Sequence, residues 1–286
     1  YFDGQFDDAR LALNLGQTAA EHGGVILNYA EAKNIRKNPF GKVEGLTIVD
    51  RTTNETIEVN AKSVINATGI FVDDILKLDS QSHKNLVRPS QGAHIVVDKK
   101  FLGNQDALMI PETSDGRVLF GVPWHGKVLL GTTDTPLNEH QIEPRPLEEE
   151  IEFILNTANA YLDNAPTRND VLSVFAGLRP LAAPTDKDSN STKEISRDHK
   201  LITSTSGLVT ITGGKWTTYR KMAEETVDMA ISVGGLQPKA CATTTLQIHG
   251  YSTERRDGHW QVYGSDTEEI QKLVKIDSSL GNKLHP

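Results

Sequence analysis

The sequence contains a single cysteine, Cys241, which excludes an intramolecular disulfide and a cysteine metal cluster. It lacks any apolar run near the roughly 18 residues that a membrane-spanning helix needs, and it lacks the basic and apolar segments of a secretory signal. Positive charge is also scarce: 30 Lys and Arg face 38 Asp and Glu, for a net charge of -8. This balance argues against a general nucleic-acid binder, although it permits a local basic pocket for a small anion. The composition is that of a soluble globular protein, which we expect in the cytoplasm.

Several catalytic signatures are missing as well. The histidines do not have metal-ligand spacing, and neither a Gly-x-Ser-x-Gly elbow nor a phosphate-binding P-loop occurs. The chain begins at Tyr1 without a methionine and stops at Pro286 without a closing element. We therefore expect it to be an interior fragment of a longer protein.

Hydrophobic periodicity predicts the secondary structure. Apolar residues at three- and four-residue spacing from Phe6 to Ala20 indicate a helix. Strand-like runs then lie at 25–30, 43–50, 56–59 and 63–67, the last expected to be fully buried, and a helix to Leu78 follows. The later predicted elements are a strand at 94–97, a hairpin of 117–122 with 128–132, a helix at 147–162, a strand at 172–175, a loop at 184–192, a hairpin of 201–204 with 208–212, a helix from 213 to 233 with Met222, Thr226, Met229 and Ala230 inward, and a helix at 266–274.

This order of elements predicts an α/β (α+β) fold in which a mostly antiparallel sheet interrupts a nucleotide-binding fold. The chain would leave one domain, build a second and return to the first. The predicted boundaries are 1–86 for a partial nucleotide-binding domain, 87–200 for a substrate-binding (cap) domain, 201–236 for the return, and 237–286 for the start of a C-terminal region.

Two loops have the features of a cofactor site. The strand Val64-Ile65-Asn66 ends in Ala67-Thr68-Gly69, where small residues let a nucleotide approach the backbone. Gly213-Gly214 expose backbone N–H groups at a helix start, beside Lys215, Trp216, Thr217 and Thr218. The helix dipole there favours an anion or an electron-rich carbonyl edge. Taken singly, each motif is also compatible with an ordinary turn or helix cap.

Three cations and one histidine are candidates for chemistry. Arg179, Arg197 and Lys215 lie next to predicted strand ends, and arginine can hold a phosphate or carboxylate through two parallel hydrogen bonds. His94 interrupts an apolar strand, either as a core histidine or as a general base that accepts a hydroxyl proton while hydride leaves the same carbon. A single surface arginine is equally compatible with a solvated charge or a salt bridge.

Read together, these segments resemble the FAD-dependent glycerol-3-phosphate dehydrogenase and oxidase family. The matching stretches follow the family order to about Val233. They are Tyr1-Phe2-Asp3-Gly4 through Asp7-Asp8-Ala9-Arg10-Leu11, Asn66-Ala67-Thr68-Gly69, Gly92-Ala93-His94-Ile95-Val96-Val97, Gly131-Thr132-Thr133-Asp134, Gly177-Leu178-Arg179-Pro180-Leu181, Ser196-Arg197-Asp198, and Gly213-Gly214-Lys215-Trp216-Thr217-Thr218-Tyr219-Arg220-Lys221-Met222-Ala223.

The resemblance implies an amino-acid-oxidase-like flavoenzyme. It would oxidise sn-glycerol 3-phosphate to dihydroxyacetone phosphate by hydride transfer to FAD, with quinone or oxygen as the final acceptor. His94, Arg179 and Lys215 would face the substrate, Arg179 would hold its phosphate, and Arg197 would assist on the phosphate side. Lys215 would also stabilise negative charge on the reduced flavin. The FAD site would be lined by Ala67, Thr68, Gly69, Gly213, Gly214, Lys215, Trp216, Thr217 and Thr218.

The family's strand-Gly-x-Gly-x-x-Gly-helix, which grips the FAD pyrophosphate, is absent from this sequence. We therefore expect the fragment to bind FAD weakly or not at all and to be inactive alone. Family dehydrogenases also lie peripherally on the cytoplasmic face of the membrane, an association implied by the resemblance only. Two alternatives remain open: a flavoenzyme of the same fold for a 2-hydroxy acid or amino acid, and a non-catalytic anion-binding or interaction module.

Overall fold

The computed structural model describes residues 5–114, 116–182, 199–254, 256 and 258–282. The chain divides into two compact units. The smaller consists of Tyr1–Glu31, Asp50–Asn54 and Lys239–Pro286, and the larger of Ala32–Val49 and Glu55–Pro238. The domain boundaries proposed from the sequence divide the chain more finely and stay a prediction.

The smaller unit brings the two ends of the sequence together. Helix α1 (Asp8–Glu21) and helix α5 (Thr267–Ile276) confirm the predicted terminal helices. Two side chains of α1 hold the backbone of His249: the Asn14 amide donates to its carbonyl oxygen at 2.6 Å, and the Thr18 hydroxyl accepts from its N–H at 2.8 Å.

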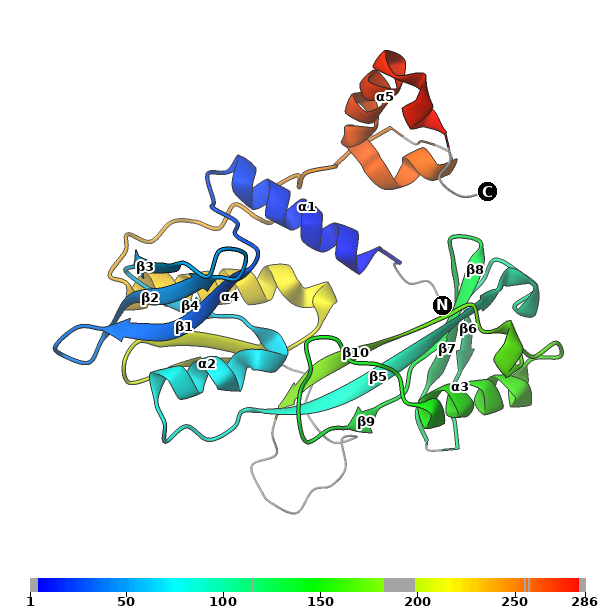
Figure 1. The fold of residues 1–286 in the computed structure, drawn as a ribbon, viewed down its shortest axis with the longest axis horizontal. Helices are drawn as coiled ribbons and strands as arrows, with labels where there is room; N and C mark the ends of the chain where they lie inside the picture. Colours follow the sequence, from blue (N-terminus) through cyan, green and yellow to red (C-terminus); the bar gives the residue numbers. More distant parts are fainter. Residues whose placement is uncertain (1–4, 115, 183–198, 255, 257, 283–286) are drawn as a thin grey trace. The chain divides into compact units, whose positions relative to one another are not determined.

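The larger unit contains an antiparallel sheet with strand order β10-β5-β8-β7-β6, in which β9 also pairs with β5 (Figure 1). Its strands are β5 (Val87–Asp98), β6 (Leu108–Ile110), β7 (Leu119–Trp124), β8 (Lys127–Gly131), β9 (Thr135–Pro136) and β10 (Ser173–Ala182). The predicted hairpin at 117–132 is confirmed. It turns through His125 and Gly126, both with positive φ, as the tight turns that match strand twist require.

Helix α3 (Glu148–Tyr161) covers one face of this sheet. Ala93, Ile95 and Val97 alternate along β5 with more exposed residues, and they pack against Ile151 and Ile154 of α3. Each of these five side chains is at most 3% exposed. Burial of one such side chain contributes about 1.5–3 kcal/mol, so this layer fixes which face of the sheet remains open.

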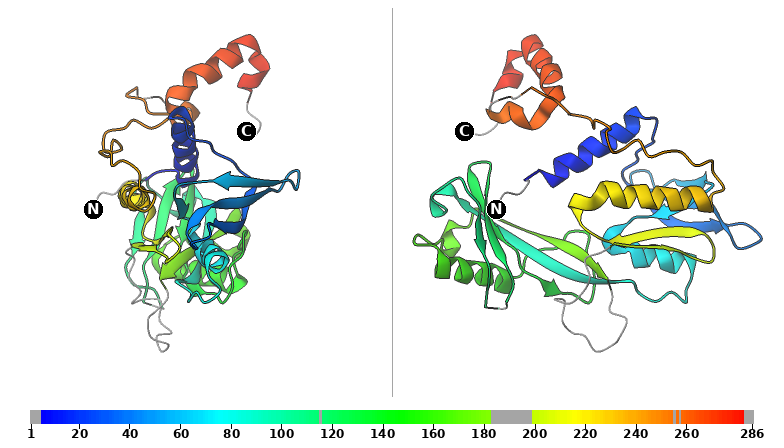
Figure 2. Two further views of the ribbon diagram at one scale, coloured as in Figure 1. Left: turned by 90° about the vertical axis from the view of Figure 1, so that its left-hand side faces the viewer. Right: turned by 180° about the vertical axis from the view of Figure 1, so that it is seen from behind.

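A second sheet, of order β11-β12-β4, contains the two predicted cofactor loops. Strands β12 and β4 run parallel and β11 runs antiparallel to β12. Helices α2 and α4 lie on opposite sides of β12 (Figure 2). The bounds are β4 (Val64–Asn66), 3-10 helix η1 (Gly69–Phe71), α2 (Val72–Asp79), β11 (His199–Thr203), β12 (Leu208–Gly213), η4 (Trp216–Thr218) and α4 (Tyr219–Val233).

The remaining strands form a three-stranded sheet of order β1-β2-β3. They are β1 (Ala30–Lys37), β2 (Val43–Asp50) and β3 (Thr56–Asn60). Lys37 of β1 ties this sheet to α2 by an ion pair of 2.8 Å with the buried Asp79. The other short helices are η2 (Lys99–Phe101), η3 (Arg168–Asp170), η5 (Gly258–Asp266) and η6 (Ser278–Gly281).

Three local predictions were wrong. The run 25–30 is not a strand up to Tyr29, and Val25 is 82% exposed. The strand is instead Ala30–Lys37, where Arg36 pairs with carboxylates of β2 and β3 and the backbone bonds to β2. Strand β4 is not fully buried, because Ile65 points away from the core and is 41% exposed. Met229 of α4 is likewise 37% exposed, whereas Thr226 and Ala230 face inward as expected.

Candidate functional site

The loop after β4 and the loop after β12 lie at the same edge of one sheet. The two strands are parallel with Thr210 opposite Asn66, so their carboxyl ends meet. Asn66, which is 1% exposed, holds the first loop: its side-chain oxygen accepts from the Thr68 hydroxyl at 2.7 Å and its amide donates to the Val72 carbonyl at 3.0 Å. The structure thus brings together the two segments that the sequence indicated separately.

Glycines are required in the second loop. Gly213 and Gly214 have φ of 75° and 79°, a region that other residues rarely adopt. A Cβ on Gly214 would also lie 2.6 Å from the Met222 sulfur. After this turn Lys215 is exposed, as are Trp216, Thr217 and Thr218 at the start of the helical segment. The backbone N–H groups there are at the positive end of α4.

These loops fit a flat, electron-rich cofactor edge. A Cβ placed on Gly69 would meet nothing within 4 Å, so space is open beside that backbone. The facing loop supplies a lysine, helix N–H groups and threonine hydroxyls to an anionic group. Within the described residues no group of His, Cys, Asp and Glu could hold a metal ion.

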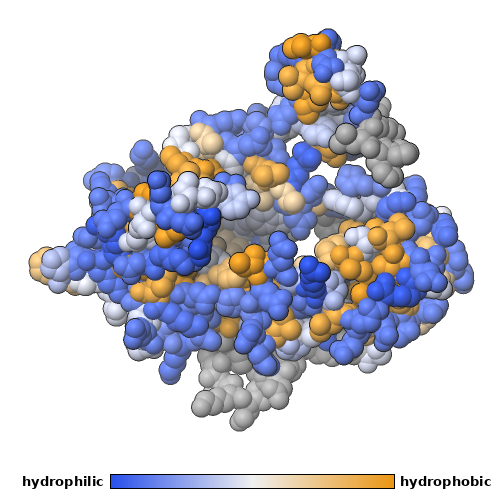
Figure 3. Space-filling view, in the orientation of Figure 1, coloured by the Kyte–Doolittle hydropathy of each residue, from blue (hydrophilic) through white to orange (hydrophobic). Residues whose placement is uncertain are grey.

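A row of residues crosses the antiparallel sheet, and their side chains, where they have one, lie on the face opposite α3. Strand register places the members opposite one another from β6 to β10, and apolar side chains gather over these strands in Figure 3. The row is Met109, Phe120, Gly131, His94 and Phe175. Met109 and Phe175 are 43% and 45% exposed. This face therefore offers an apolar and aromatic surface with one imidazole in it.

His94 is held between its two neighbours in this row. Its ring stacks on Phe175 with centroids 5.0 Å apart and an interplanar angle of 7°. On the other side it lies over Gly131, where a Cβ would come within 2.3 Å of the imidazole Cδ2. The glycine is needed for the ring to lie against the sheet.

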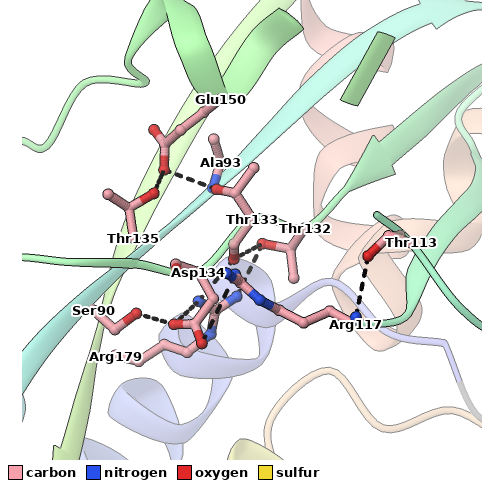
Figure 4. A network of polar contacts seen from close by, with 10 residues as sticks. All are labelled: Ser90, Ala93, Thr113, Arg117, Thr132, Thr133, Asp134, Thr135, Glu150 and Arg179. Atoms are coloured by element: carbon pink, nitrogen blue, oxygen red, sulfur yellow. Dashed lines mark hydrogen bonds and ion pairs between the residues drawn. The ribbon is translucent and has the colours of Figure 1, made fainter. Parts of the chain in front are cut away.

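Arg179 lies on the same face, beyond Gly92. A Cβ on Gly92 would be 2.3 Å from the guanidinium NH2, so this glycine too makes room for a flat side chain. The guanidinium donates to the Thr133 carbonyl at 3.1 Å and to the Thr132 hydroxyl at 2.9 Å (Figure 4). It also pairs with the Asp134 carboxylate at 3.6 Å. Because Gly92 and His94 are two residues apart on one strand, the arginine and the imidazole are neighbours.

Asp134 connects this arginine to two further polar groups. Its carboxylate accepts a hydrogen bond from the Ser90 hydroxyl, which is fully buried. Arg117 donates to the Asp134 carbonyl oxygen at 2.9 Å (Figure 4). Arg179 is thus fixed on one side by the segment Thr132–Asp134.

On the α3 face the same segment binds Glu150, which is 4% exposed. Burial by itself raises the pKa of this carboxyl, but hydrogen bonds from Thr135, the Leu147 N–H, Gln91 and Thr133 hold the pKa below its ordinary value of 4.5. Since the folded state then binds this proton less tightly than the unfolded chain, the carboxylate stabilises the fold at neutral pH. That contribution is lost as the pH falls below about 4.5.

Of the predicted chemical residues, the structure brings His94 and Arg179 together. Lys215 lies at the edge of the other sheet, and no hydrogen bond or ion pair joins it to either of them among the described residues. Strand β10, which carries Arg179, contacts both β12 and η1 within the same unit. Arg197 and the predicted loop 184–192 lie outside the described residues.

The close contact between the His94 ring and Gly131 leads to a testable prediction. Replacing Gly131 by alanine should displace the imidazole, because 2.3 Å is closer than any real Cβ contact. We expect kcat to fall about 100-fold, as misplacing a reacting group by about 1 Å does. Gly177→Ala is the matched control, because Gly177 lies on the same face of the sheet in β10 and its Cβ would meet nothing within 4 Å. Equal steady-state kinetics of the two variants would contradict the assignment.

Residues 1–220 match the family of FAD dependent oxidoreductases (DAO), and the chain belongs to that family. Within this family it is similar to glycerol-3-phosphate dehydrogenases. It is 42% identical over 282 residues to the mitochondrial enzyme of Saccharomyces cerevisiae, covering 87% of this chain and 44% of that protein. It is 41% identical over 288 residues to the mitochondrial enzyme SDP6 of Arabidopsis thaliana, covering 100% and 44%.

A solved structure agrees with these relatives. The glycerol-3-phosphate dehydrogenase of Bacillus halodurans in complex with FAD is 33% identical with a TM-score of 0.78, over 98% of this chain and 52% of that one. The chain spans about half the length of the relatives it matches. The predicted family, amino-acid-oxidase-like fold and FAD cofactor are confirmed.

One prediction is overturned. The sequence led us to expect a cytoplasmic protein, but the relatives from yeast, plant and mammals are named as mitochondrial. Composition carries no signal for this distinction. Among the described residues, no helix has the length and apolar content that crossing a bilayer needs.

Sequence reasoning assigned no role to Ser90, Arg117, Asp134 and Glu150. Asp134 belongs to Gly131-Thr132-Thr133-Asp134, one of the stretches that match the family. A carboxylate directly after two threonines in that stretch was the sequence signal that could have identified it. Glu150 could have been found by periodicity, because it shares the apolar face of its helix with Leu147 and Ile154. Ser90 and Arg117 carry no sequence signal that separates them from other polar strand residues.

Proposed function

We propose that this chain is the substrate-facing part of an enzyme that oxidises sn-glycerol 3-phosphate to dihydroxyacetone phosphate. The proposal is carried by one observation. His94 and Arg179 lie side by side on the open face of a sheet in a chain similar over most of its length to glycerol-3-phosphate dehydrogenases. The planar Arg179 guanidinium can donate two parallel hydrogen bonds to two oxygens of one phosphate. The imidazole lies close enough to reach the carbon chain of the same small substrate.

Each of the proposed site residues has its own role. Arg179 binds the phosphate, and His94 accepts the proton of the C2 hydroxyl as hydride leaves C2, so that the ketone forms. FAD, when bound, would supply the hydride acceptor. Lys215 stabilises the negative charge that develops beside it, and Arg197 assists on the phosphate side.

The cofactor would be held at the edge formed by the two loops. Ala67, Thr68 and Gly69 allow close approach on one side. On the other, Gly213, Gly214 and Lys215 to Thr218 supply backbone N–H groups and hydroxyls. The apolar row with Phe120 and Phe175 would cover a flat ring and exclude water from the reacting carbon.

The electrons then pass to quinone or to oxygen. The names of the relatives support a mitochondrial dehydrogenase, and quinone as acceptor would bring the protein to a membrane surface.

The test is the visible flavin absorbance, without oxygen, of the whole enzyme of which we propose this chain is a part, with FAD bound. Adding glycerol 3-phosphate should bleach the flavin band and yield an equal amount of dihydroxyacetone phosphate. Bleaching by a 2-hydroxy acid or an amino acid alone would show that the enzyme oxidises one of these carboxylate substrates instead, because Arg179 can hold a carboxylate as well. A flavin that none of these compounds bleaches would refute the proposal.

A further inference from the structure

Glu150 is a buried carboxylate in contact with four hydrogen-bond donors. Its Oε1 accepts from the Thr133 hydroxyl at 2.8 Å and the Thr135 hydroxyl at 2.6 Å. Its Oε2 accepts from the Gln91 amide at 2.7 Å and from the Leu147 N–H at 2.9 Å. Burying a charge is costly unless it is fully hydrogen-bonded. This carboxylate therefore fixes the groups around it strongly.

The segment that Glu150 holds is the one that holds Arg179. Along Thr133, Asp134 and Thr135 the side chains alternate, as in an extended strand. The two threonines point to Glu150, and Asp134 between them points to the opposite face, toward Arg179 and Ser90 (Figure 4). The carbonyl of Thr133 also accepts from the Arg179 guanidinium.

The same network reaches the strand that carries His94. The Thr133 hydroxyl, while it donates to Glu150, accepts from the backbone N–H of Ala93 at 2.8 Å. Ala93 lies between Gly92, over which the guanidinium lies, and His94. The Glu150 carboxylate is thus two hydrogen bonds away from Arg179 and two hydrogen bonds away from Ala93, the residue before His94.

We propose that Glu150 is a positioning residue: it holds the segment Thr133–Thr135 from below the sheet so that Arg179 meets the substrate phosphate in the productive orientation. This inference rests on the proposed function. The proposed positioning role requires the Glu150 carboxylate itself. In Glu150→Gln one end of the side chain becomes an NH2 group, which faces either the two threonine hydroxyls or the Gln91 and Leu147 donors.

The first experiment compares Glu150→Gln with Glu149→Gln in the FAD-bound protein. Glu149 precedes it on the same helix but is exposed, so its replacement removes the same charge without touching the segment. We expect Glu150→Gln to raise KM for glycerol 3-phosphate about 10- to 100-fold, with a smaller fall in kcat, because a misplaced binding group costs about that much. A merely structural role would lower the fraction of active protein and leave KM unchanged, and that result would overturn the proposal.

A double-mutant cycle with Arg179→Ala tests the route of action. If Glu150 acts through Arg179, the KM effect of Glu150→Gln should vanish in the Arg179→Ala background. Additive effects would overturn the proposal. Should Glu150→Gln fail to fold, Thr135→Val removes a single donor from the same carboxylate, and it should raise KM in the same direction.

Failure of this proposal is distinguishable from failure of the proposed function. If Arg179→Ala leaves KM unchanged, Arg179 does not bind the phosphate and the proposed function itself is wrong in that part. If Arg179→Ala raises KM while Glu150→Gln and Thr135→Val do not, only the positioning role of Glu150 is refuted.

Discussion

Replacing Arg179 by alanine is expected to raise KM for glycerol 3-phosphate about 100-fold or more. A hydrogen bond to a charged group contributes about 1.5–3 kcal/mol, and about 1.4 kcal/mol corresponds to a factor of ten. The alanine would remove the two bonds that we propose the guanidinium makes to the phosphate. Arg179→Lys keeps the charge without the planar fork, so its KM should fall between the wild type and alanine.

Steady-state kinetics against glycerol 3-phosphate measure this effect, with inorganic phosphate as a competitive inhibitor to separate binding from turnover. Arg168→Ala is the control, since Arg168 is exposed and pairs with Glu148. The phosphate-binding role is wrong if the KM of Arg179→Ala stays near that of Arg168→Ala.

The second large effect is expected at His94. In His94→Gln the amide retains part of the imidazole's shape against Phe175 but cannot accept the hydroxyl proton. A general base contributes about 10²- to 10⁴-fold, so we expect kcat to fall by that amount with KM little changed. The rise of kcat with pH that deprotonation of the base produces should also disappear.

Rapid-reaction measurement of flavin bleaching reports the hydride step directly. His22→Gln, at an exposed position after α1, is the control for a histidine outside the site. If His94→Gln bleaches its flavin as fast as His22→Gln does, another group accepts the proton.

Much of this fold could be predicted because its signals are local. The apolar spacing of Ile151, Ile154 and Ala158 predicts a helix that packs on a sheet, and α3 does so. His125-Gly126 between alternating strands predicts the tight hairpin that is present. The two cofactor loops were found separately by their glycines. Their meeting at one sheet edge depends on the parallel pairing of β4 with β12, which joins residues far apart in sequence.

The errors and omissions have a common physical origin. Val25 belongs to an apolar run, yet strand formation depends on a hydrogen-bonding partner, and β2 pairs with the charged segment that follows. Glu150 looked like one of three consecutive acids at a helix start. Its neighbours Glu148 and Glu149 are exposed. Of its four donors only the Leu147 N–H is close in sequence, whereas Gln91, Thr133 and Thr135 belong to the strands and the connecting segment below α3. Such roles follow from long-range contacts and not from residue type.

Strand β10 pairs with β5 without a bulge, from Ser173 opposite Val96 to Ala182 opposite Val87. Because successive side chains point to opposite faces, inserting or deleting one residue between Phe175 and Arg179 would turn the guanidinium toward α3. A single-codon insertion or deletion in this stretch would therefore separate the imidazole from the arginine. The spacing between the proposed proton acceptor and the proposed phosphate-binding residue is in this sense encoded as a count of residues.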